Sequence, residues 1–287
     1  MDRRARTLIL MILITLGLGV GCLLLIPKKS DGVAKVHMLN VGQGDSFLIE
    51  AKNGRQLLID AGKDAGVLGE LARVMPKGDR SIDVVIATHP DADHIGGLPQ
   101  VLSRYDVGMF LISDVATDTA QFTALMEMLR NKNIPSYYAR HGMTVMLDAD
   151  SIVPTHFSVL FPDRPTTHWE TNSASVVGRL QIGQTSMLLG GDAPSSLEDF
   201  LLEARPQAVD VDILKLGHHG SKTSTSEVFL KATSPALAVV SAGVANRYGH
   251  PAPEVLSRLK QLGIPFVTTQ ESGTVTFTTD GTTWKQK

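Results

Sequence analysis

The chain has 287 residues, of which 43% are hydrophobic, and a formal net charge of -2 at pH 7. A chain of this length and composition can bury one core or at most two, which argues against disorder. The near-neutral charge gives no sign of a broad basic surface for nucleic acid, although it is compatible with a local cationic groove. Cys22 is the only cysteine, so an internal disulfide is excluded.

Residues 1–30 are predicted to be a separate targeting segment. The opening MDRRAR is followed by an apolar run from Leu8 to Ile26, about the ~20 residues that span a bilayer as a helix. Arginines before the run favour a cytoplasmic N-terminus and export of the domain after the run. We therefore expect one uncleaved membrane helix, which would make this a single-pass protein of the cell membrane with an extracytoplasmic domain. The alternative is a cleaved signal, which would leave a secreted protein.

Residues 33–287 are predicted to form one α/β domain. SFLIEA and QLLIDAG are expected strands on either side of KNGR, whose Asn53-Gly54 pair is a strong hairpin signal. KVHMLNV and SIDVVIATH are further expected strands, and HIGGLPQVLSRY is expected to begin a helix beside the histidines. TAQFTALMEMLRNKN predicts an amphipathic helix with Phe122, Leu125, Met126 and Leu129 on its buried stripe.

The second half of the chain repeats the plan of the first. VDVDILKLGHHGS parallels IDVVIATHPDADH, since each has an aspartate, an apolar strand and then histidines, and a helix over TSEVFLKA comes next. SASVVGRLQIGQTSMLLGGDAP predicts two strands around a turn with Asp192 after the second, and ALAVVSAG predicts a strand that leads to His250. The two halves are therefore expected to bring histidines and aspartates from strand ends to one site.

The ligand spacing in THPDADHIGG predicts a metal site. His89, Asp91 and Asp93 alternate along a short loop and His94 adjoins them, which is too many ligands for one tetrahedral ion. Together with the lone Asp192 they indicate two divalent cations bridged by an aspartate. Because carboxylates are hard ligands, manganese competes with zinc as the expected metal.

Five of the nine histidines fall at predicted strand ends, which chance explains poorly, whereas a single buried histidine is usually a hydrogen-bonded core residue. The five are His89, His94, His218, His219 and His250, and the remaining His37, His141, His156 and His168 are interpreted as structural.

Eight segments in order resemble the metallo-β-lactamase superfamily and, within it, the C-terminal hydrolase-like domain of ComEC/Rec2-type competence proteins. They cover nearly all of residues 36–280 and read NVGQGDSFLIE, NGRQLLIDAG, THPDADHIGG, TNSASVV, LLGGDA, DILKLGHHGSKTSTS, YGHP and SGTVTFTTDG. The resemblance implies an α/β fold, namely an αββα four-layer sandwich, with the metal site along the edge of two facing sheets.

The resemblance also implies roles for individual residues. His89 and Asp91 would bind the first metal, and Asp93, His94 and a late histidine the second. His250 is among the candidate ligands, and which of His218 and His219 is a ligand and which is catalytic stays open. Asp192 would bridge the two metals. Asp60 would orient the ligand loop from behind it.

This sequence departs from the wider superfamily at two positions and from the competence branch at a third. Asp91 stands where most members have a third histidine of the loop, and Asn172 stands where many have a ligand histidine. Both leave the first metal short of donors, for which His218 is a candidate. Asn40 replaces an aspartate that is usual in the competence branch, and it has no assigned role.

The expected activity is that of a metal-dependent hydrolase with two bound Zn or Mn ions. The HHGSKTSTS loop places hydroxyls, imidazoles and one cation beside the metals, a group suited to phosphate oxygens. We therefore expect phosphodiester cleavage, with DNA in a competence-related role as the substrate that the resemblance implies. The candidate catalytic residues are Asp93, His218, His219 and Lys222.

Three alternatives stay open. The same chemistry could remove phosphocholine-type groups from cell-wall polymers. Asn172 and Asn40 motivate a binding module that has lost turnover, although five costly, charge-dense ligands argue against it. The serines and threonines of the HHGSKTSTS loop could simply cap the helix that starts near Ser226.

Overall fold

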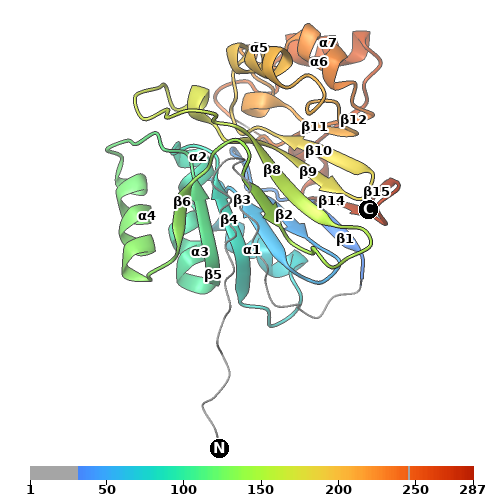
Figure 1. Cartoon of the computed structure of the whole chain (residues 1–287). Helices are drawn as coiled ribbons and strands as arrows, with labels where there is room; N and C mark the ends of the chain where they lie inside the picture. The colour runs from blue at the N-terminus through green and yellow to red at the C-terminus, as the bar shows by residue number, and fades with distance from the viewer. Residues whose placement is uncertain (1–31, 245) are drawn as a thin grey trace, which may run out of the picture.

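Two β-sheets pack face to face, and helices cover the outer face of each sheet, in the computed structural model, which describes residues 32–244 and 246–287 (Figure 1). The expected αββα four-layer sandwich is therefore present. The predicted membrane helix and the alternative signal, residues 1–30, lie outside the described residues. Within the part of the chain that is described, no helix is both long and apolar enough to cross a membrane.

The first sheet has eight strands in the order β15-β14-β1-β2-β3-β4-β5-β6. The predicted hairpin is confirmed, since β2 and β3 pair antiparallel from Phe47 opposite Ile59 to Glu50 opposite Gln56. From β3 to β6 the strands run parallel. The strands are β1 Ala34–Met38, β2 Phe47–Glu50, β3 Gln56–Ile59, β4 Ser81–Ala87, β5 Asp106–Ile112, β6 Ser136–Tyr138, β14 Val275–Thr279 and β15 Trp284–Gln286.

The second sheet has seven strands in the order β13-β12-β11-β10-β9-β8-β7. Strands β10 to β13 run parallel, so their carboxyl ends meet at one edge of the sheet, where loops can gather functional groups. The strands are β7 Thr144–Met146, β8 Thr155–Phe161, β9 Val177–Ile182, β10 Thr185–Leu189, β11 Ile213–Lys215, β12 Leu237–Val240 and β13 Phe266–Thr268.

Three apolar cores hold the four layers together. One lies between the sheets and includes Phe47, Phe157 and Phe277, and the other two lie between each sheet and its helices. The helices of the first sheet are α1 Gly66–Val74, α2 Ala92–Ile95, α3 Leu98–Arg104 and α4 Ala120–Asn131. Those of the second are α5 Ser195–Ala204, α6 Glu227–Thr233 and α7 Pro253–Gln261, and short turns are α8 Thr269–Ser272, η1 Asn172–Ala174 and η2 Gly217–Gly220.

The predicted amphipathic helix is confirmed as α4, whose Leu125 and Leu129 are buried and whose Phe122 and Met126 pack against the same core. In contrast, the single helix expected over HIGGLPQVLSRY is two helices, α2 and α3, which break at a glycine pair. A Cβ on Gly96 would lie 2.1 Å from the backbone oxygen of Lys63. This close approach of two backbones requires glycine and brings the loop after β3 against the loop after β4.

The end of one strand and the presence of several others also differ from what the sequence patterns predict. The strand expected over residues 35–41 ends at Met38, because Gly42 and Gly44 adopt positive φ and turn the chain. Strands β5 to β8 were not predicted from the sequence. Short strands such as β6 and β7, of three residues each, are defined by their neighbours in the sheet, which no local pattern contains.

His37 in β1 is a structural histidine, as the sequence indicated. Its ring is buried, and Nδ1 lies 2.9 Å from Thr276 Oγ1. Burial, with a smaller effect of Lys35, lowers the pKa of His37 from 6.5 to about 4. The folded protein therefore resists protonation of a group that is protonated readily in the unfolded chain.

We expect His37 to weaken the fold in acid. Above pH 6.5 the ring is neutral in both states and contributes nothing to the pH dependence. Between pH 6.5 and about 4 only the unfolded chain takes up the proton, so the free energy of unfolding falls by about 3 kcal/mol across this window. Urea titrations of the wild type and His37→Gln at pH 7 and pH 4 would check this, and an equal difference at both pH values would contradict it.

Candidate metal centre

The loop after β4 presents two buried histidines with their ring orientation fixed. His89 follows the strand, and its Nδ1 lies 3.1 Å from Thr88 Oγ1 and 3.4 Å from Ser175 Oγ. His94 lies in α2, and its Nδ1 is 2.8 Å from Asp60 Oδ2. Since each Nδ1 already has a polar neighbour, both Nε2 atoms remain to face the site.

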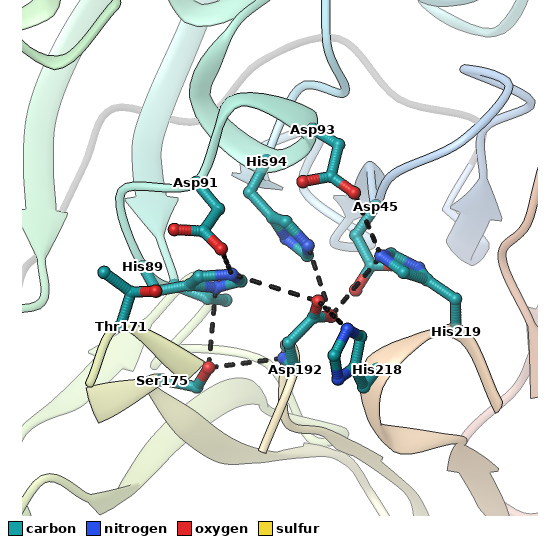
Figure 2. Close-up of polar contacts among 12 residues, drawn as sticks. Asp45, His89, Asp91, Asp93, His94, Thr171, Ser175, Asp192, His218 and His219 are labelled. Carbon is teal, nitrogen blue, oxygen red and sulfur yellow. Dashed lines mark hydrogen bonds and ion pairs between the residues drawn. The ribbon is translucent and has the colours of Figure 1, made fainter. Parts of the chain in front are cut away.

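Asp192 follows β10 and lies between two groups of side chains (Figure 2). Its Oδ2 atom lies 3.6 Å from His218 Nε2 and 4.0 Å from His89 Nε2, and Asp91 Oδ2 is 3.7 Å from His89 Nε2. We call His89, Asp91 and His218 the first donor set. Asp91 and His218 are partly exposed, at 39% and 28%, so this set opens toward solvent.

The other oxygen of Asp192 faces a different group. Oδ1 lies 3.2 Å from His94 Nε2 and 3.5 Å from His219 Nε2, and His219 Nε2 is 3.4 Å from Asp93 Oδ2. We call Asp93, His94 and His219 the second donor set. Asp192 is thus shared between the two sets, with one oxygen for each, as the bridging position predicted from the sequence requires.

The donor chemistry of the site fits divalent cations. His89 Nε2, His94 Nε2, His219 Nε2 and Asp192 Oδ1 are buried and have no hydrogen-bond partner. Buried polar atoms without partners are costly, and here they converge, because donors of His89, His94 and Asp192, and of Asp93, His94 and His219, lie within 4.8 Å of one another. Imidazole nitrogens and carboxylate oxygens at this spacing are ligands for zinc or manganese.

The electrostatics of the site also favour a cation. Burial would raise the pKa of the Asp192 carboxyl, but His219 and His94 outweigh burial and hold that pKa well below its usual range. Burial lowers the pKa of His89 to about 3, so its Nε2 lone pair is free for a metal. Burial disfavours charge on His219, but Asp192 and Asp45 outweigh it and raise the pKa of His219 to about 9.

The loop after β11 places both of its histidines by an unusual backbone. His218 and His219 are consecutive residues with φ of 47° and 55°, in the left-handed region that side chains other than glycine rarely adopt. Each such residue costs on the order of 1–3 kcal/mol and persists where the surroundings impose it. This backbone directs His218 to one oxygen of Asp192 and His219 to the other.

Two residues that were not predicted from the sequence support the second donor set. Asp45 is buried after β1, with Oδ1 3.3 Å from His219 Nδ1. Lys215, the last residue of β11, pairs with the other oxygen of Asp45 and donates to Gly191 O at 2.6 Å. The GQGD segment contains Asp45, but nothing in its spacing ties it to a histidine of the loop after β11.

Residues 39–244 match the family model described as the metallo-beta-lactamase superfamily. The chain belongs to the metallo-beta-lactamase superfamily. Members of this superfamily are generally metal-dependent hydrolases whose fold binds divalent metals, which agrees with the two donor sets around Asp192.

Within the superfamily, the chain is similar to curated competence proteins. It is 30% identical to ComE operon protein 3 of Bacillus subtilis over 266 residues, 87% of this chain and 33% of that protein. It is 31% identical to competence protein ComA of Neisseria gonorrhoeae over 86% of this chain and 32% of that protein, and 32% identical to recombination protein 2 of Haemophilus influenzae over 88% and 30%. The chain therefore spans about a third of the length of these relatives.

Solved structures show the same metallo-beta-lactamase fold. Igni18, a metallo hydrolase from Ignicoccus hospitalis, superposes with a TM-score of 0.55 at 17% identity, covering 85% of this chain and 98% of that one. The metallo-beta-lactamase fold protein YhfI from Bacillus subtilis superposes with a TM-score of 0.55 at 13% identity, covering 86% and 100%. At these identities the likeness establishes the fold alone.

The structure brings together most of the side chains that the sequence singled out, and it leaves His250 and Lys222 outside the two donor sets as defined above. His250 lies outside the donor groups found among the described residues, with its ring centroid 5.4 Å from that of His218. Lys222 is exposed on the surface. Ser226 caps α6 by accepting from Phe229 N at 3.1 Å, which confirms the capping interpretation for that serine.

The two asparagines that departed from the family pattern have different surroundings. Asn40 accepts from Gly42 N at 3.3 Å and so stabilises the turn before Asp45. Asn172 begins η1, and its side-chain oxygen is buried without a hydrogen-bond partner. Beside it, Ser175 accepts from Asp192 N at 3.3 Å, which ties this segment to the bridging residue.

Replacing Asp60 is expected to weaken metal binding without removing a ligand. Asp60 accepts from Thr88 N and Thr88 Oγ1, at 2.8 and 2.7 Å, and orients His94. Loss of such a supporting carboxylate lowers metal affinity by about 10–100-fold. We expect this loss for Asp60→Asn in a competition titration with a chelating dye. The same change at exposed Asp118 should leave the affinity unchanged, and equal affinities for both variants would refute the role of Asp60.

Proposed function

We propose that the chain is a phosphodiesterase that uses two divalent cations, Zn or Mn, and cleaves DNA in a competence-related role at the outer face of the cell membrane. The observation that carries the proposal is the shared Asp192, whose two oxygens face separate donor sets 3.2 to 4.0 Å away. Paired divalent ions are characteristic of enzymes that hydrolyse phosphate esters, including nucleases.

Each metal would be held by one donor set and by one oxygen of Asp192. His89, Asp91 and His218 would hold the first, and Asp93, His94 and His219 the second. When bound, the two ions would lower the pKa of water toward neutrality and supply a nucleophile for attack on phosphorus.

The other residues of the site keep these ligands in place. Asp60 holds His94 through the Nδ1 of its ring. The Nδ1 of His219 is hydrogen-bonded to Ser241 O at 2.9 Å, and the carboxylate of Asp45 lies 3.3 Å from the same nitrogen. Ser221 Oγ and Thr223 Oγ1 lie 3.0 Å apart and hydrogen-bond to each other, so they order the loop after the histidines. The partly exposed Asp91 and His218 mark the side from which a phosphodiester would approach.

The names of the relatives support DNA as the substrate. Competence protein ComA and recombination protein 2 are both names of proteins concerned with DNA. Because this chain spans about a third of their length, we assign to it the hydrolytic part of such a system rather than the whole of it.

Membrane tethering is proposed from the sequence of residues 8–34. If the run from Leu8 to Ile26 spans the bilayer, PKKSDGVA connects it to β1. Eight residues reach at most about 29 Å, at ~3.3–3.6 Å each, so the domain would act on polymers close to the membrane. A C-terminally tagged chain should stay with the membrane fraction and be digested by external protease in cells stripped of their wall. Recovery of the tag from the medium would contradict this tether.

The activity is tested with the full chain purified in detergent. Metal analysis after loading with Mn or Zn should give two equivalents per chain, and labelled DNA and methyl p-nitrophenyl phosphate should both be cleaved. Cleavage of a phosphocholine diester without cleavage of DNA would favour the cell-wall alternative. Less than one equivalent of metal under every loading condition, with no turnover, would leave a binding module.

A further inference from the structure

A cavity of about 530 Å³ opens beside the second donor set. Asp93 lines it, so the cavity reaches the proposed metal centre directly. Its other walls come from the loops after β1, β3 and β12, and include Gln43, Lys63, Arg247 and Tyr248. The volume lies within the range of about 300–1,000 Å³ typical of small-molecule sites, and it exceeds what one phosphate needs.

The rim of the cavity carries two cations and an exposed aromatic ring. Lys63 and Arg247 are both exposed, and Tyr248 is 56% exposed. The guanidinium carbon of Arg247 lies 5.0 Å from the centre of the Tyr248 ring, and Arg247 Nη2 donates to Tyr248 Oη at 2.8 Å. A planar cation and a planar ring are thus held together within reach of the metal ligands.

The wall that bears Arg247 and Tyr248 is fixed by two amide side chains. Asn246 Nδ2 donates to Gly243 O and His250 O, at 2.9 and 2.6 Å. Gln270 Nε2 donates to the same two oxygens, at 2.7 and 2.9 Å. Gly243 O and His250 O, on either side of Arg247 and Tyr248 in the chain, therefore each accept a hydrogen bond from both amides.

We propose that this cavity binds the nucleotide next to the scissile phosphodiester of a single strand of nucleic acid. Lys63 and Arg247 bind its phosphate oxygens, and its base packs against the exposed part of the Tyr248 ring, beside the contacts that the ring makes with Arg247 and His250. The assignment rests on the phosphodiesterase activity proposed above and adds to it the single-stranded form of the substrate and the residues that bind it. Single strands are bound in this way, by cations along the backbone and planar groups against the bases.

The charges of the cavity argue against a phosphocholine diester as its ligand. A quaternary ammonium is recognised by aromatic rings without competing cations. Here the exposed ring of Tyr248 contacts Arg247 and lines the same cavity as Lys63, so a choline group would meet two positive charges. A nucleotide brings a negative phosphate to these cations and a neutral base to the ring.

Binding is measured apart from cleavage. The full chain in detergent, with EDTA present, is titrated into a fluorescein-labelled oligothymidylate of eight nucleotides, and anisotropy gives the Kd. We expect Tyr248→Ala to raise the Kd about 10-fold or more, from the loss of stacking on one base. Tyr248→Phe keeps the ring and should bind within about twofold of wild type.

The cations are tested by the salt dependence of the same Kd. Lys63→Gln should lower the slope of log Kd against log salt by about 0.7, the value for one phosphate contact on a single strand. The matched control is Lys77→Gln, an exposed lysine before β4 at the opposite end of that strand from His89, which should leave the slope unchanged.

The outcomes separate this inference from the proposed activity. Binding that Tyr248→Ala weakens and Tyr248→Phe preserves, without any DNA cleavage by the metal-loaded protein, supports the site and refutes the nuclease. Cleavage of DNA with Kd and salt slope unchanged in Tyr248→Ala and Lys63→Gln overturns the site and leaves the nuclease standing. Failure of the wild type to bind the oligonucleotide also overturns the site.

Discussion

Asp192→Asn is expected to lower kcat/KM for DNA by about 10³-fold or more. The substitution keeps the shape of the side chain but turns one of its two oxygens into an amide nitrogen, which cannot bind a metal. Since Oδ1 serves the second donor set and Oδ2 the first, one set loses its shared ligand in either orientation of the amide. The charge stabilisation supplied by a metal is worth several kcal/mol, and about 4 kcal/mol corresponds to about 10³-fold.

The matched control for this variant is Asp199→Asn. Asp199 is an exposed aspartate of α5, a little further along the chain, and the chemical change is the same. Steady-state kinetics and metal analysis on both variants isolate the effect of the position. If Asp192→Asn retained two metal equivalents and activity within tenfold of wild type, Asp192 would not be the bridging ligand.

The ligand loop could be predicted from the sequence because its information is local. His89, Asp91, Asp93 and His94 lie within six residues, right after a β-branched run, so the strand fixes where they emerge. The same holds for His218 and His219 after β11. Each loop follows a strand of a parallel stretch, β4 in the first sheet and β11 in the second, and the carboxyl ends of parallel strands meet at one edge of their sheet. That the two edges face one site follows from the packing of the two sheets, which the family resemblance implied and the local patterns did not.

Which histidine belongs to which donor set could not be predicted from the sequence. Which late histidine joins Asp93 and His94 depends on the left-handed backbone at His218 and His219, which no propensity predicts. That backbone brings His219 into the second donor set, whereas the ring centroid of His250 lies 6.5 Å from that of His219. The cavity beside Asp93 could not be predicted from the sequence either, because its walls come from loops that are far apart in the chain.

Asp45 and Lys215 show how a buried charge pair escapes prediction from sequence. The first follows a glycine in a loop and the second ends an apolar strand, and neither position signals a contact with the other. In the structure both are at most 2% exposed. A lysine is rarely buried unless it is paired, and the burial of Lys215 accordingly goes with its ion pair to Asp45.

Lys215→Met is expected to lower the free energy of unfolding by about 3–5 kcal/mol, the cost of leaving a buried charge without its partner. Lys215 Nζ pairs with Asp45, donates to Gly191 O at 2.6 Å and lies 3.8 Å from Asp192 Oδ1. Its removal therefore leaves the buried carboxylates of Asp45 and Asp192 without the positive charge that lies close to both. Urea titrations with EDTA present measure the change without a contribution from bound metal.

Two comparison variants separate the buried pair from a lysine effect in general. Lys231→Met breaks the exposed pair with Glu227, where the side chains are 61% and 54% exposed, and should cost only about 0.3–0.5 kcal/mol. The double variant Lys215→Met/Asp45→Leu removes the orphaned carboxylate as well, and apolar replacement of both partners is often nearly neutral. We therefore expect the double variant to be more stable than Lys215→Met alone. If the double variant were less stable than the wild type by the sum of the changes in Lys215→Met and Asp45→Leu, the two residues would not act as a pair. The hydrogen bond of His219 Nδ1 to Ser241 O, at 2.9 Å, would then be the main support of that ring.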